Sequence, residues 1–494
     1  MTSIDKTERK GRVPEVVLDE DPDLAEFSAF AWESALRHVA RREGVPQSPY
    51  MDEGFAPNRI WIWDTCFMAL FARYAPDLLP GVASLDNFYR PMLDGEPTAL
   101  PVHIPDNPPL FAWAEWEHYL QTGDAARMDL VFHKMRYPQR MFRLFERFQA
   151  GDRMPCQSSV FPVMWEKRPL GYMWTGGRSG MDNTPRGDFS ASVFDNDPRY
   201  LSVLWIDAIS QQALACRIIH EVTGRDIWER RFRAFAETIN ANYWDEETGA
   251  YYDIATSAPH GKARVLTPAS FWPLLAGVVP PERARRLAAH LENPDELGGA
   301  VPFPSVARNS RHFDSGGRYW RGGVWLPTAY VCVRGLEENG FAELADRLAE
   351  QLVRWQMETW RQCEPHTIWE CYSPTEPKPA TGKFPEKAES GGARPDFCGW
   401  SALGPINMVI ENIVGIRCDA LRRRIEWRLH RADRHGVRHL HFDGGTVSLV
   451  FNGASAIEAE TDVPFTLCVN GTAHEVPRGR SLLALGAAAA GGGL

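Results

Sequence analysis

The chain has 494 residues, of which 44% are hydrophobic and 24% are charged, and its formal net charge is -10. A chain of this length can form one large domain with an appendage, or two to three domains. The acidic balance provides no basic field to attract nucleic acid or an anionic membrane. We therefore expect neither as a partner.

Cysteine use and the N-terminal sequence point to the cytoplasm. Nine cysteines are scattered singly from Cys66 to Cys468 without a CxxC pair, which is neither a disulfide framework nor a zinc site. The N-terminus, MTSIDKTERKGRVPEVVLDEDPD, lacks the apolar core of a signal peptide, and no long uncharged apolar run follows. We expect a cytoplasmic protein with no bound metal and no cofactor.

Helical periodicity begins after a polar N-terminal segment, residues 1–22, and extends through residues 23–418. The first segment, DLAEFSAFAWESALRHVARREG, has apolar residues at spacings of three and four, begins with Asp and ends with Gly. Further helices are predicted at 64–75, 109–122, 125–149, 200–223, 226–243, 268–292, 324–338, 340–361 and 400–415.

Long Gly/Pro-rich loops separate several of these helices, at residues 151–198, 293–322 and 364–398. Loops of this length in a compact domain are usually functional or disordered, and these contain Trp, which argues against disorder. Helices joined alternately by short and long loops favour a mainly α fold, an (α/α)6 toroid barrel with the long loops on one face.

The pattern changes near residue 420 to alternating apolar and polar residues with GG and NG turn signals. We predict a small C-terminal antiparallel β domain over residues 419–482. The last segment, residues 483–494, is low in complexity and is expected to form a frayed tail.

Tryptophan is unusually frequent, with 18 residues, and many lie in loop-like stretches beside Asp, Glu, Arg and Gly. Aromatic faces next to polar groups commonly hold sugar rings, although a single Trp is more often core filler. Ten in this context favour a sugar pocket: Trp61, Trp63, Trp113, Trp116, Trp165, Trp174, Trp320, Trp325, Trp369 and Trp400.

Two acidic residues stand in loops that could present them to a substrate. The stretch WTGGRSGMDNTPR, residues 174–186, is too rich in Gly and Pro for a helix, so Asp182 lies in a loop. Glu370 lies in HTIWECYSPTEP, residues 366–377. Inverting hydrolysis of a glycosidic bond needs one protonated carboxyl and one carboxylate that activates water. Asp182 and Glu370 are the natural pair.

Each of these residues also has a simpler interpretation. Asp64 could cap the helix that follows it, and Arg321 could clamp a loop carboxylate. Glu370 alone would more often be an ion-pair partner than a catalyst. Several acidic residues compete with Asp182 for the acid role: Glu166, Asp188, Asp195 and Asp197.

Five motifs in order carry a family resemblance: WDTCF, GMDNTPR, YWRGGVW, WECYSP and GWSALGP. Together they resemble glycoside hydrolase family 63 and its bacterial mannosylglycerate hydrolase-like branch, among the (α/α)6 glycosidases that include trehalase. The resemblance spans residues 55–415 and implies an inverting hydrolase, with Asp182 as general acid and Glu370 as general base. It also implies a sugar subsite lined by Trp63, Asp64, Arg321, Trp325 and Tyr372. YWRGGVW departs from the family at Gly323, where Pro is common.

We therefore expect hydrolysis of a small soluble glucoside or mannoside, such as a glycosylglycerate or a disaccharide. Trp113, Trp174, Trp320 and Trp400 are further candidates for the pocket. Arg178, Arg186 or Arg321 would bind the carboxylate of a glycosylglycerate. A trehalase-like exo-α-glucosidase and a sugar epimerase on the same barrel remain alternatives. The sequence leaves open the sugar, the aglycone, a role of the β domain in the pocket, and whether the protein forms a homo-oligomer.

Overall fold

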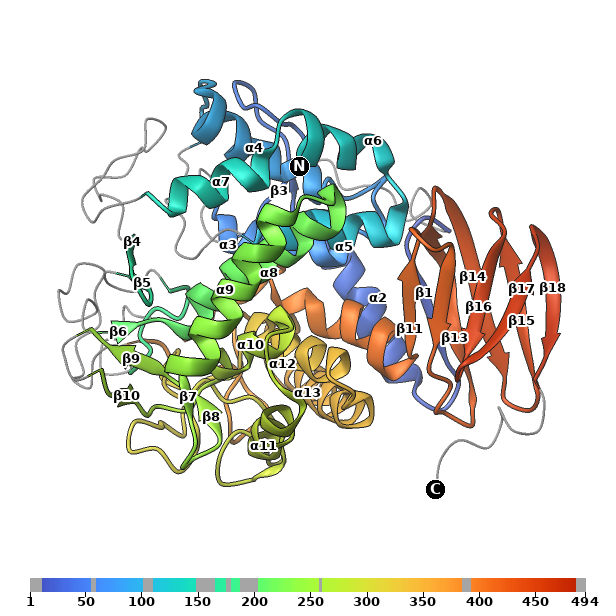
Figure 1. Cartoon of the computed structure of the whole chain (residues 1–494). Coiled ribbons are helices and arrows are strands. Elements are labelled where there is room, and N and C mark those ends of the chain that lie inside the picture. The colour runs from blue at the N-terminus through green and yellow to red at the C-terminus, as the bar shows by residue number, and fades with distance from the viewer. Residues whose placement is uncertain are drawn as a thin grey trace.

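The computed structural model describes residues 11–54, 59–100, 110–147, 165–174, 179–186, 203–256, 260–383 and 392–485. Within these residues, helices dominate up to residue 413 and a β-rich part follows (Figure 1). The α-helices are α2 (Pro22–Arg37), α3 (Ile62–Ala72), α4 (Asp86–Tyr89), α5 (Phe111–Thr122), α6 (Ala125–Met128), α7 (Tyr137–Phe145), α8 (Ile206–Thr223), α9 (Asp226–Asn242), α10 (Trp272–Ala276), α11 (Pro281–Glu292), α12 (Leu326–Glu338) and α13 (Ala342–Gln362).

Short 3-10 and π-helical segments extend or connect these helices. They are η1 (Val82–Leu85), η2 (Arg90–Asp94), η3 (Asp129–Lys134), η5 (Pro268–Phe271), η7 (Ser401–Leu403) and η8 (Gly404–Ile413). Short strands between the helices are β2 (Val39–Ala40), β3 (Tyr50–Met51), β4 (Trp165–Arg168), β5 (Gly171–Trp174), β6 (Val203–Leu204), β7 (Trp244–Asp245), β8 (Ala250–Tyr251), β9 (Asp253–Ala255) and β10 (Lys262–Ala263).

Helix positions agree with the periodicity except at two of the predicted segments. The prediction of one helix over 125–149 was wrong, because the chain breaks into α6, η3 and α7, with Arg136 at φ 57° before α7. The prediction over 268–292 was also wrong, because Pro273 and the Pro280–Pro281 pair divide that segment into η5, α10 and α11. Proline lacks the N–H that a continuous helix needs.

The C-terminal part consists of two sheets, with strand orders β1-β13-β14-β15-β18 and β11-β12-β16-β17. Their strands are β1 (Glu15–Leu18), β11 (Ile416–Asp419), β12 (Arg424–Trp427), β13 (Arg434–Phe442), β14 (Gly445–Asn452), β15 (Ala456–Thr461), β16 (Phe465–Val469), β17 (Thr472–Val476) and β18 (Gly479–Ala484).

Two features of these sheets differ from the sequence-based expectation. The sheets are not wholly antiparallel, because β12 pairs with β16 in parallel. The N-terminal segment also supplies a strand, since β1 pairs antiparallel with β13 and places Val16 opposite Val437. Strand β18 ends at Ala484, inside the predicted tail, and residues 486–494 lie outside the described chain. The domain boundary at residue 419 stays a prediction, and β11 begins at Ile416.

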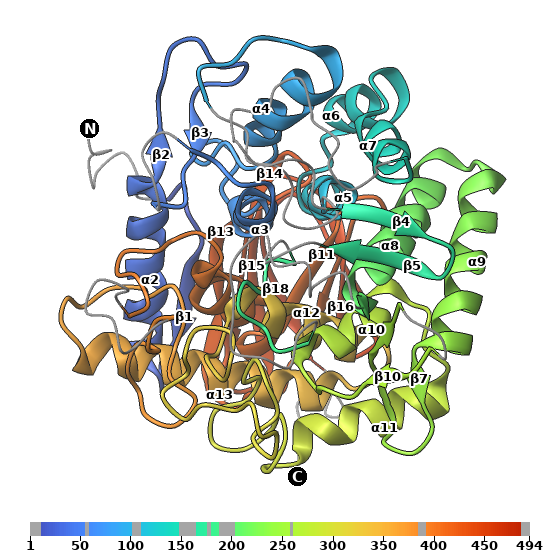
Figure 2. The same cartoon turned by 90° about the vertical axis from the view of Figure 1, so that its left-hand side faces the viewer.

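Partly buried ion pairs connect the β-rich part to the helices. Arg428 contacts Asp346 of α13 at 2.6 Å and Glu337 of α12 at 2.8 Å. Arg417 of β11 contacts Glu411 of η8 at 3.0 Å. Seen from the side in Figure 2, the strands of this part lie behind the helices.

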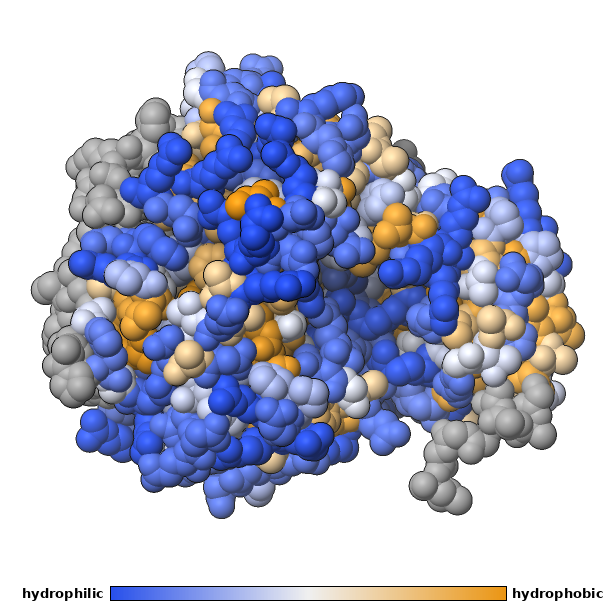
Figure 3. Space-filling model, viewed as in Figure 1, coloured by the Kyte–Doolittle hydropathy of each residue, from blue (hydrophilic) through white to orange (hydrophobic). Residues whose placement is uncertain are grey.

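The surface in Figure 3 is mainly hydrophilic, with hydrophobic residues in small scattered groups. Scattered apolar residues of this kind are normal on a protein surface. None of the helices in the described residues combines the length and apolar character required to cross a membrane.

Candidate active site

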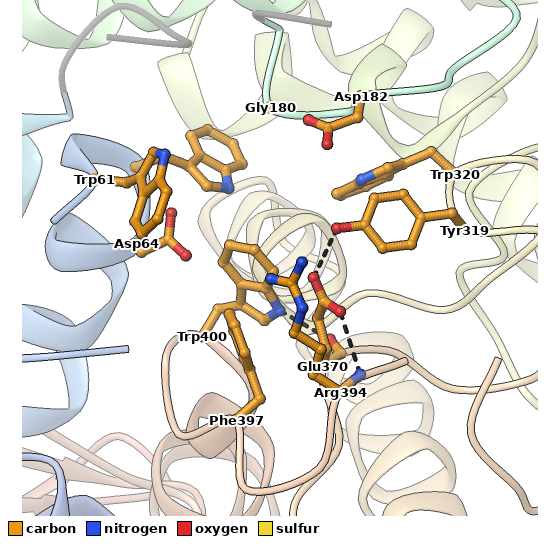
Figure 4. Close-up of a pocket in the computed structure, with 11 residues that line it drawn as sticks. Trp61, Asp64, Gly180, Asp182, Tyr319, Trp320, Glu370, Arg394, Phe397 and Trp400 are labelled. Atoms are coloured by element: carbon orange, nitrogen blue, oxygen red, sulfur yellow. Dashed lines mark hydrogen bonds between the residues drawn. The ribbon is translucent and has the colours of Figure 1, made fainter. Parts of the chain in front are cut away.

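One pocket brings together residues from four distant segments of the chain (Figure 4). Its volume is about 480 Å³, including space open to solvent. It is lined by Trp61, Trp63, Asp64, Gly180, Asp182, Tyr319, Trp320, Glu370, Arg394, Phe397 and Trp400.

The loop that carries Asp182 is fixed by the residues on either side of it. Gly180 has φ +80°, a left-handed conformation that L side chains rarely adopt. Asn183 is fully buried; its side-chain amide donates to the Arg318 backbone carbonyl at 2.9 Å, and its side-chain oxygen accepts from the backbone N–H of Trp320 at 2.7 Å. These two bonds join the Asp182 loop to the loop that carries Tyr319. In the motif GMDNTPR, Asp182 therefore lines the pocket while the adjacent Asn183 holds the two loops together.

Two glycines allow the second loop to fold tightly around Tyr319. A Cβ at Gly323 would lie 2.4 Å from the Tyr319 carbonyl oxygen, and one at Gly322 would lie 2.3 Å from the Asp314 carbonyl oxygen. Gly323 also donates its N–H to the Gly317 carbonyl at 2.9 Å. A proline at position 323 would remove that donor and require the loop to move. The Pro that is common at this position in the family that the motifs resemble therefore does not fit this loop conformation.

Glu370 is 2% exposed and is held by donors on both carboxylate oxygens (Figure 4). The Tyr319 hydroxyl donates to Oε1 at 2.6 Å, and the Arg394 backbone N–H donates to Oε2 at 3.3 Å. The Trp400 indole N–H donates to the Glu370 carbonyl at 2.9 Å. The carboxylate is therefore fixed in direction toward the pocket.

The pKa of Glu370 lies above its ordinary value, chiefly because burial disfavours the charged form. The Arg394 charge, the Tyr319 hydrogen bond and the Arg394 N–H all oppose this rise in pKa, and the Asp182 charge adds to it. A carboxylate with a raised pKa is a stronger base once it is ionised. Glu370 can therefore take a proton from a water molecule in the pocket.

Asp182 is 31% exposed in its side chain and forms an ion pair with Lys383. The same ammonium lies 4.8 Å from the centroid of the Tyr319 ring. Lys383 therefore contacts both the Asp182 carboxylate and the residue that holds Glu370. It is not one of the lining residues, and its side chain is 28% exposed.

Aromatic rings form the wall next to the two carboxyls. Trp320 stacks on Trp325 with a centroid distance of 4.0 Å and an interplanar angle of 6°. Trp325 in turn contacts Trp400, which packs on Phe397. Trp320, Trp400 and Phe397 reach the pocket, whereas Trp325 supports them from behind. A flat apolar surface of this kind suits the C–H face of a sugar ring.

The opposite wall comes from the start of α3. Trp61 precedes the helix, and Trp63 and Asp64 lie in its first turn. The Trp63 ring packs edge-on against Phe67 at 4.7 Å. Asp64 is 8% exposed and lines the pocket, so its position suits a polar contact with substrate.

Several residues predicted to bind substrate do not line this pocket. Trp113 is buried in the core, where it stacks on Tyr330 and donates to Glu117 at 3.3 Å. Tyr372 is buried, and its hydroxyl accepts from Gln356 at 3.0 Å. Arg321 is 7% exposed and is also absent from the lining. Trp174 ends β5, and its side chain lies outside what is described.

The structure gives Arg186 a role in the core and not at the pocket rim. It is 1% exposed, contacts Asp207 at 2.8 Å and Asp253 at 2.7 Å, and lies over the Trp205 ring. The sequence-based expectation that it binds a substrate carboxylate is therefore corrected, because both sides of its guanidinium are occupied. Arg178 and Asp188 lie outside the described residues.

Sequence reasoning did not assign a role to Tyr319, Arg394, Phe397 or Gly180, which all line the pocket, whereas Trp61 was among the ten tryptophans expected at a sugar pocket. Gly180 and Tyr319 stood within motifs that had been noted for other residues, and Phe397 lies just before the motif GWSALGP. Arg394 follows the sequence Gly-Gly-Ala and carried no local signal. In the part of the chain that is described, no cluster of three or more His, Cys, Asp or Glu side chains is arranged to hold a metal ion.

A comparison with models of protein families matches one family over most of the chain. The model of the mannosylglycerate hydrolase MGH1-like glycoside hydrolase domain matches residues 2–384. A mannosylglycerate hydrolase of Thermus thermophilus is 38% identical over 186 residues, which are 37% of this chain and 43% of that protein. One of Rubrobacter radiotolerans is 32% identical over 189 residues, which are 37% of each chain.

Among solved structures, a GH63 mannosylglycerate hydrolase from Thermus thermophilus in complex with glucose superposes with a TM-score of 0.55 at 20% identity. The match covers 77% of this chain and 99% of that one. The two proteins therefore share their fold.

Proposed function

Because this chain belongs to the mannosylglycerate hydrolase MGH1-like glycoside hydrolase family, we propose that it hydrolyses a small α-glucoside or α-mannoside with inversion of configuration. The observation that carries the proposal is that Asp182 and Glu370, from distant loops, line one pocket walled by Trp63, Trp320 and Trp400. Carboxyls in an aromatic pocket fit glycosidic bond cleavage.

In this mechanism Asp182 protonates the glycosidic oxygen and Glu370 removes a proton from the attacking water. The two groups must stand roughly 6.5–9.5 Å apart so that the water fits between the base and the sugar. Asp182 suits the acid because its side chain lines the pocket and is 31% exposed, so that a leaving group bound there can reach solvent. Glu370 suits the base because it is buried and held in one direction by Tyr319 and Arg394.

We assign the sugar that is released to the space between Trp63, Asp64 and Trp320. Trp400 closes this space, and Trp325 supports Trp320 from behind. The substrate is a small glycoside such as a glycosylglycerate or a disaccharide, which agrees with the activity named for the two bacterial relatives. The described residues that line the pocket include no histidine. They therefore do not supply the His acid or base on which the epimerase alternative would depend.

We further propose that the helices close as an (α/α)6 barrel and that the protein acts in the cytoplasm. The arrangement of α3, α5, α8, α12 and α13 around a common centre in Figure 2 supports the barrel. The eight cysteines of the described chain are all free, which suits a reducing compartment.

The test is a screen of the purified protein against α-glucosides and α-mannosides, including glucosylglycerate, mannosylglycerate and trehalose. We expect release of a monosaccharide from a glycosylglycerate, with the β-anomer as the first product seen by NMR. A first product in the α configuration would show retention and contradict the proposed mechanism. Cleavage of trehalose in preference to glycosylglycerates would favour the trehalase-like alternative.

A further inference from the structure

Glu53 is a carboxyl buried behind the wall of the pocket. It lies two residues after β3 and is fully buried, and neither of its side-chain oxygens has a hydrogen-bond partner among the described residues. Burying a polar group without a partner is costly, so a carboxyl in this position requires an explanation. Asp182 and Glu370 perform the two proton transfers of the proposed reaction without it.

Glu53 packs against the loop that carries three residues of the pocket, Arg394, Phe397 and Trp400. A Cβ at Gly399 would lie 3.2 Å from the Glu53 Cβ and 2.6 Å from the Phe397 ring. Only a glycine therefore lets this loop approach Glu53 so closely. The close approach places Glu53 directly behind the wall that the sugar would contact.

The charged groups around Glu53 come from three segments of the chain. Asp64, in the first turn of α3, affects it most, and Asp52 of its own segment comes next. The Arg394 cation has a smaller effect than these two acids. Beyond them lie His38 and Asp396, which pair with each other at 3.5 Å. A negative charge on Glu53 would thus meet more repulsion than attraction.

Glu53 and Asp64 are two buried carboxyls whose negative charges disfavour each other. Burial and the two neighbouring acids raise the pKa of Glu53 well above its ordinary value, so Glu53 is the member that keeps a proton. Asp64 is the member that lines the pocket, and the dipole of α3 favours a negative charge in its first turn. The charge of the pair therefore lies on the side that meets the sugar.

We propose that Glu53 is a neutral carboxylic acid that allows Asp64 to hold its negative charge in the sugar subsite, and that loss of the Glu53 proton weakens sugar binding. The inference rests on the proposed function, because it uses Asp64 as a contact of the sugar. An ionised Asp64 accepts hydrogen bonds from sugar hydroxyls, whereas a second negative charge behind it would repel it from this position. Glu53 acts through Asp64 and is a positioning residue.

The first test measures binding of a neutral probe, D-glucose or D-mannose, to the full chain by calorimetry between about pH 6 and pH 9. Neither sugar ionises in this range, so a pH dependence of the Kd belongs to the protein. Sugar binding is complete while Glu53 is protonated and is lost as the pH rises through its pKa. The wild-type Kd should therefore rise by up to about tenfold per pH unit above that pKa. Glu53→Gln cannot ionise, so its Kd should stay constant over the same range.

A second variant tests the direction of the effect. Asp52→Asn removes a charge that raises the pKa of Glu53, so that pKa should fall and binding should begin to weaken at a lower pH than in the wild type. Glu43→Gln is the matched control, because Glu43 is exposed in the same segment between β2 and β3. It should leave both the Kd and its pH dependence unchanged.

A wild-type Kd that stays constant over this range would overturn the inference. A Glu53→Gln variant whose Kd rises with pH as steeply as that of the wild type would also overturn it, and a merely structural Glu53 would give this result. Failure of the proposed function looks different, because the wild type would then release no sugar from any glycoside, including a glycosyl fluoride. If it also bound neither monosaccharide at any pH, the inference would be overturned together with the function.

Discussion

The Tyr319 hydroxyl lies 2.6 Å from Oε1 of Glu370 and donates its proton to that carboxylate. Tyr319 comes from the loop before α12, and Glu370 from the loop after α13. The bond lowers the pKa of Glu370 and so opposes the rise that burial causes. Tyr319 therefore helps to keep the proposed base ionised and points it at the pocket.

Tyr319→Phe removes this donor with almost no change in volume. A hydrogen bond to a charged group contributes about 1.5–3 kcal/mol, so we expect kcat/KM to fall by roughly ten- to a hundredfold. The pKa of Glu370 should rise, and the acidic limb of the pH profile should move to higher pH, because the base must be ionised to act. A pH profile of kcat/KM measures both effects. Tyr119→Phe, outside the pocket, is the control, and an unmoved acidic limb would argue against the assignment of the base.

The assigned roles of the two carboxyls predict different responses to the leaving group. Glu370→Gln should lower the rate for every substrate by about 10²–10⁴-fold, because a single displacement has no other base to activate water. Asp182→Asn should lower the rate for a poor leaving group by a similar factor, but much less for a glycosyl fluoride, which needs little protonation. Steady-state kinetics on a natural glycoside and on the fluoride separate the two.

Both of these variants preserve side-chain volume, so urea unfolding serves as the control for folding. If Asp182→Asn lost as much activity on the fluoride as on the glycoside, Asp182 would not be the acid. Glu166 of β4 and Asp188 would then be tested next, as competing acidic residues near it in sequence.

Arg186 is predicted to matter for stability and not for substrate choice. Arg186→Met would leave Asp207 and Asp253, which are each 2% exposed, without their shared cation. Removing one partner of a buried ion pair typically costs about 3–5 kcal/mol. Urea unfolding measures this cost, with Arg480→Met as the matched control, since Arg480 pairs with Glu460 on the surface and should change stability by less than about 0.5 kcal/mol. A stable Arg186→Met protein that no longer preferred an acidic substrate would restore the sequence-based role.

Glu53 is fully buried beside the pocket residues Asp64 and Arg394, and its two carboxyl oxygens have no hydrogen-bond partner among the described residues. Burial raises its pKa well above the ordinary value, and the Asp64 and Asp52 charges add to the rise. Its contribution to stability is therefore complete below the unfolded-state pKa of about 4.3 and is lost as the pH rises toward the folded-state pKa.

Glu53→Gln cannot ionise, so it should stabilise the protein more at pH 8 than at pH 5. The gain should grow by up to about 1.4 kcal/mol for each pH unit above the unfolded-state pKa, until Glu53 ionises in the folded protein as well. Urea unfolding at the two pH values tests this, and Glu458→Gln on the exposed face of β15 is the control. An equal change at both pH values would show that Glu53 keeps the same charge throughout.

Local sequence patterns correctly predicted helices that are specified by the spacing of their own apolar residues. The helix expected at 340–361 is α13 (Ala342–Gln362), and the one expected at 226–243 is α9 (Asp226–Asn242). Apolar spacing over a few turns is enough to specify such helices. The motifs around Asp64, Asp182, Trp320, Glu370 and Trp400 likewise pointed to segments that meet in one pocket.

The tertiary structure decided which side chains of those motifs face the pocket. Trp320 and Trp325 are five residues apart in one motif, yet the first lines the pocket and the second stacks behind it, because the turn at Gly322–Gly323 folds the chain back on itself. Arg186, four residues after Asp182, turns instead into a pair of buried carboxylates from α8 and β9. No local pattern distinguishes these directions.

Contacts between segments that are distant in the sequence determined the pairing of β1 and the ion pair at Asp182. The sequence did not predict β1 in the polar N-terminus, because its partner β13 lies more than 400 residues away in the sequence. A single strand does not indicate which sheet edge it will join. The ion pair between Lys383 and Asp182 likewise joins two loops that carry no shared motif. The sequence by itself therefore determined most of the helices, the family and the candidate carboxyls through short-range periodicity and motif chemistry. The orientation of each side chain and the cation at the acid depended on contacts between distant segments, which form only when the whole chain is folded.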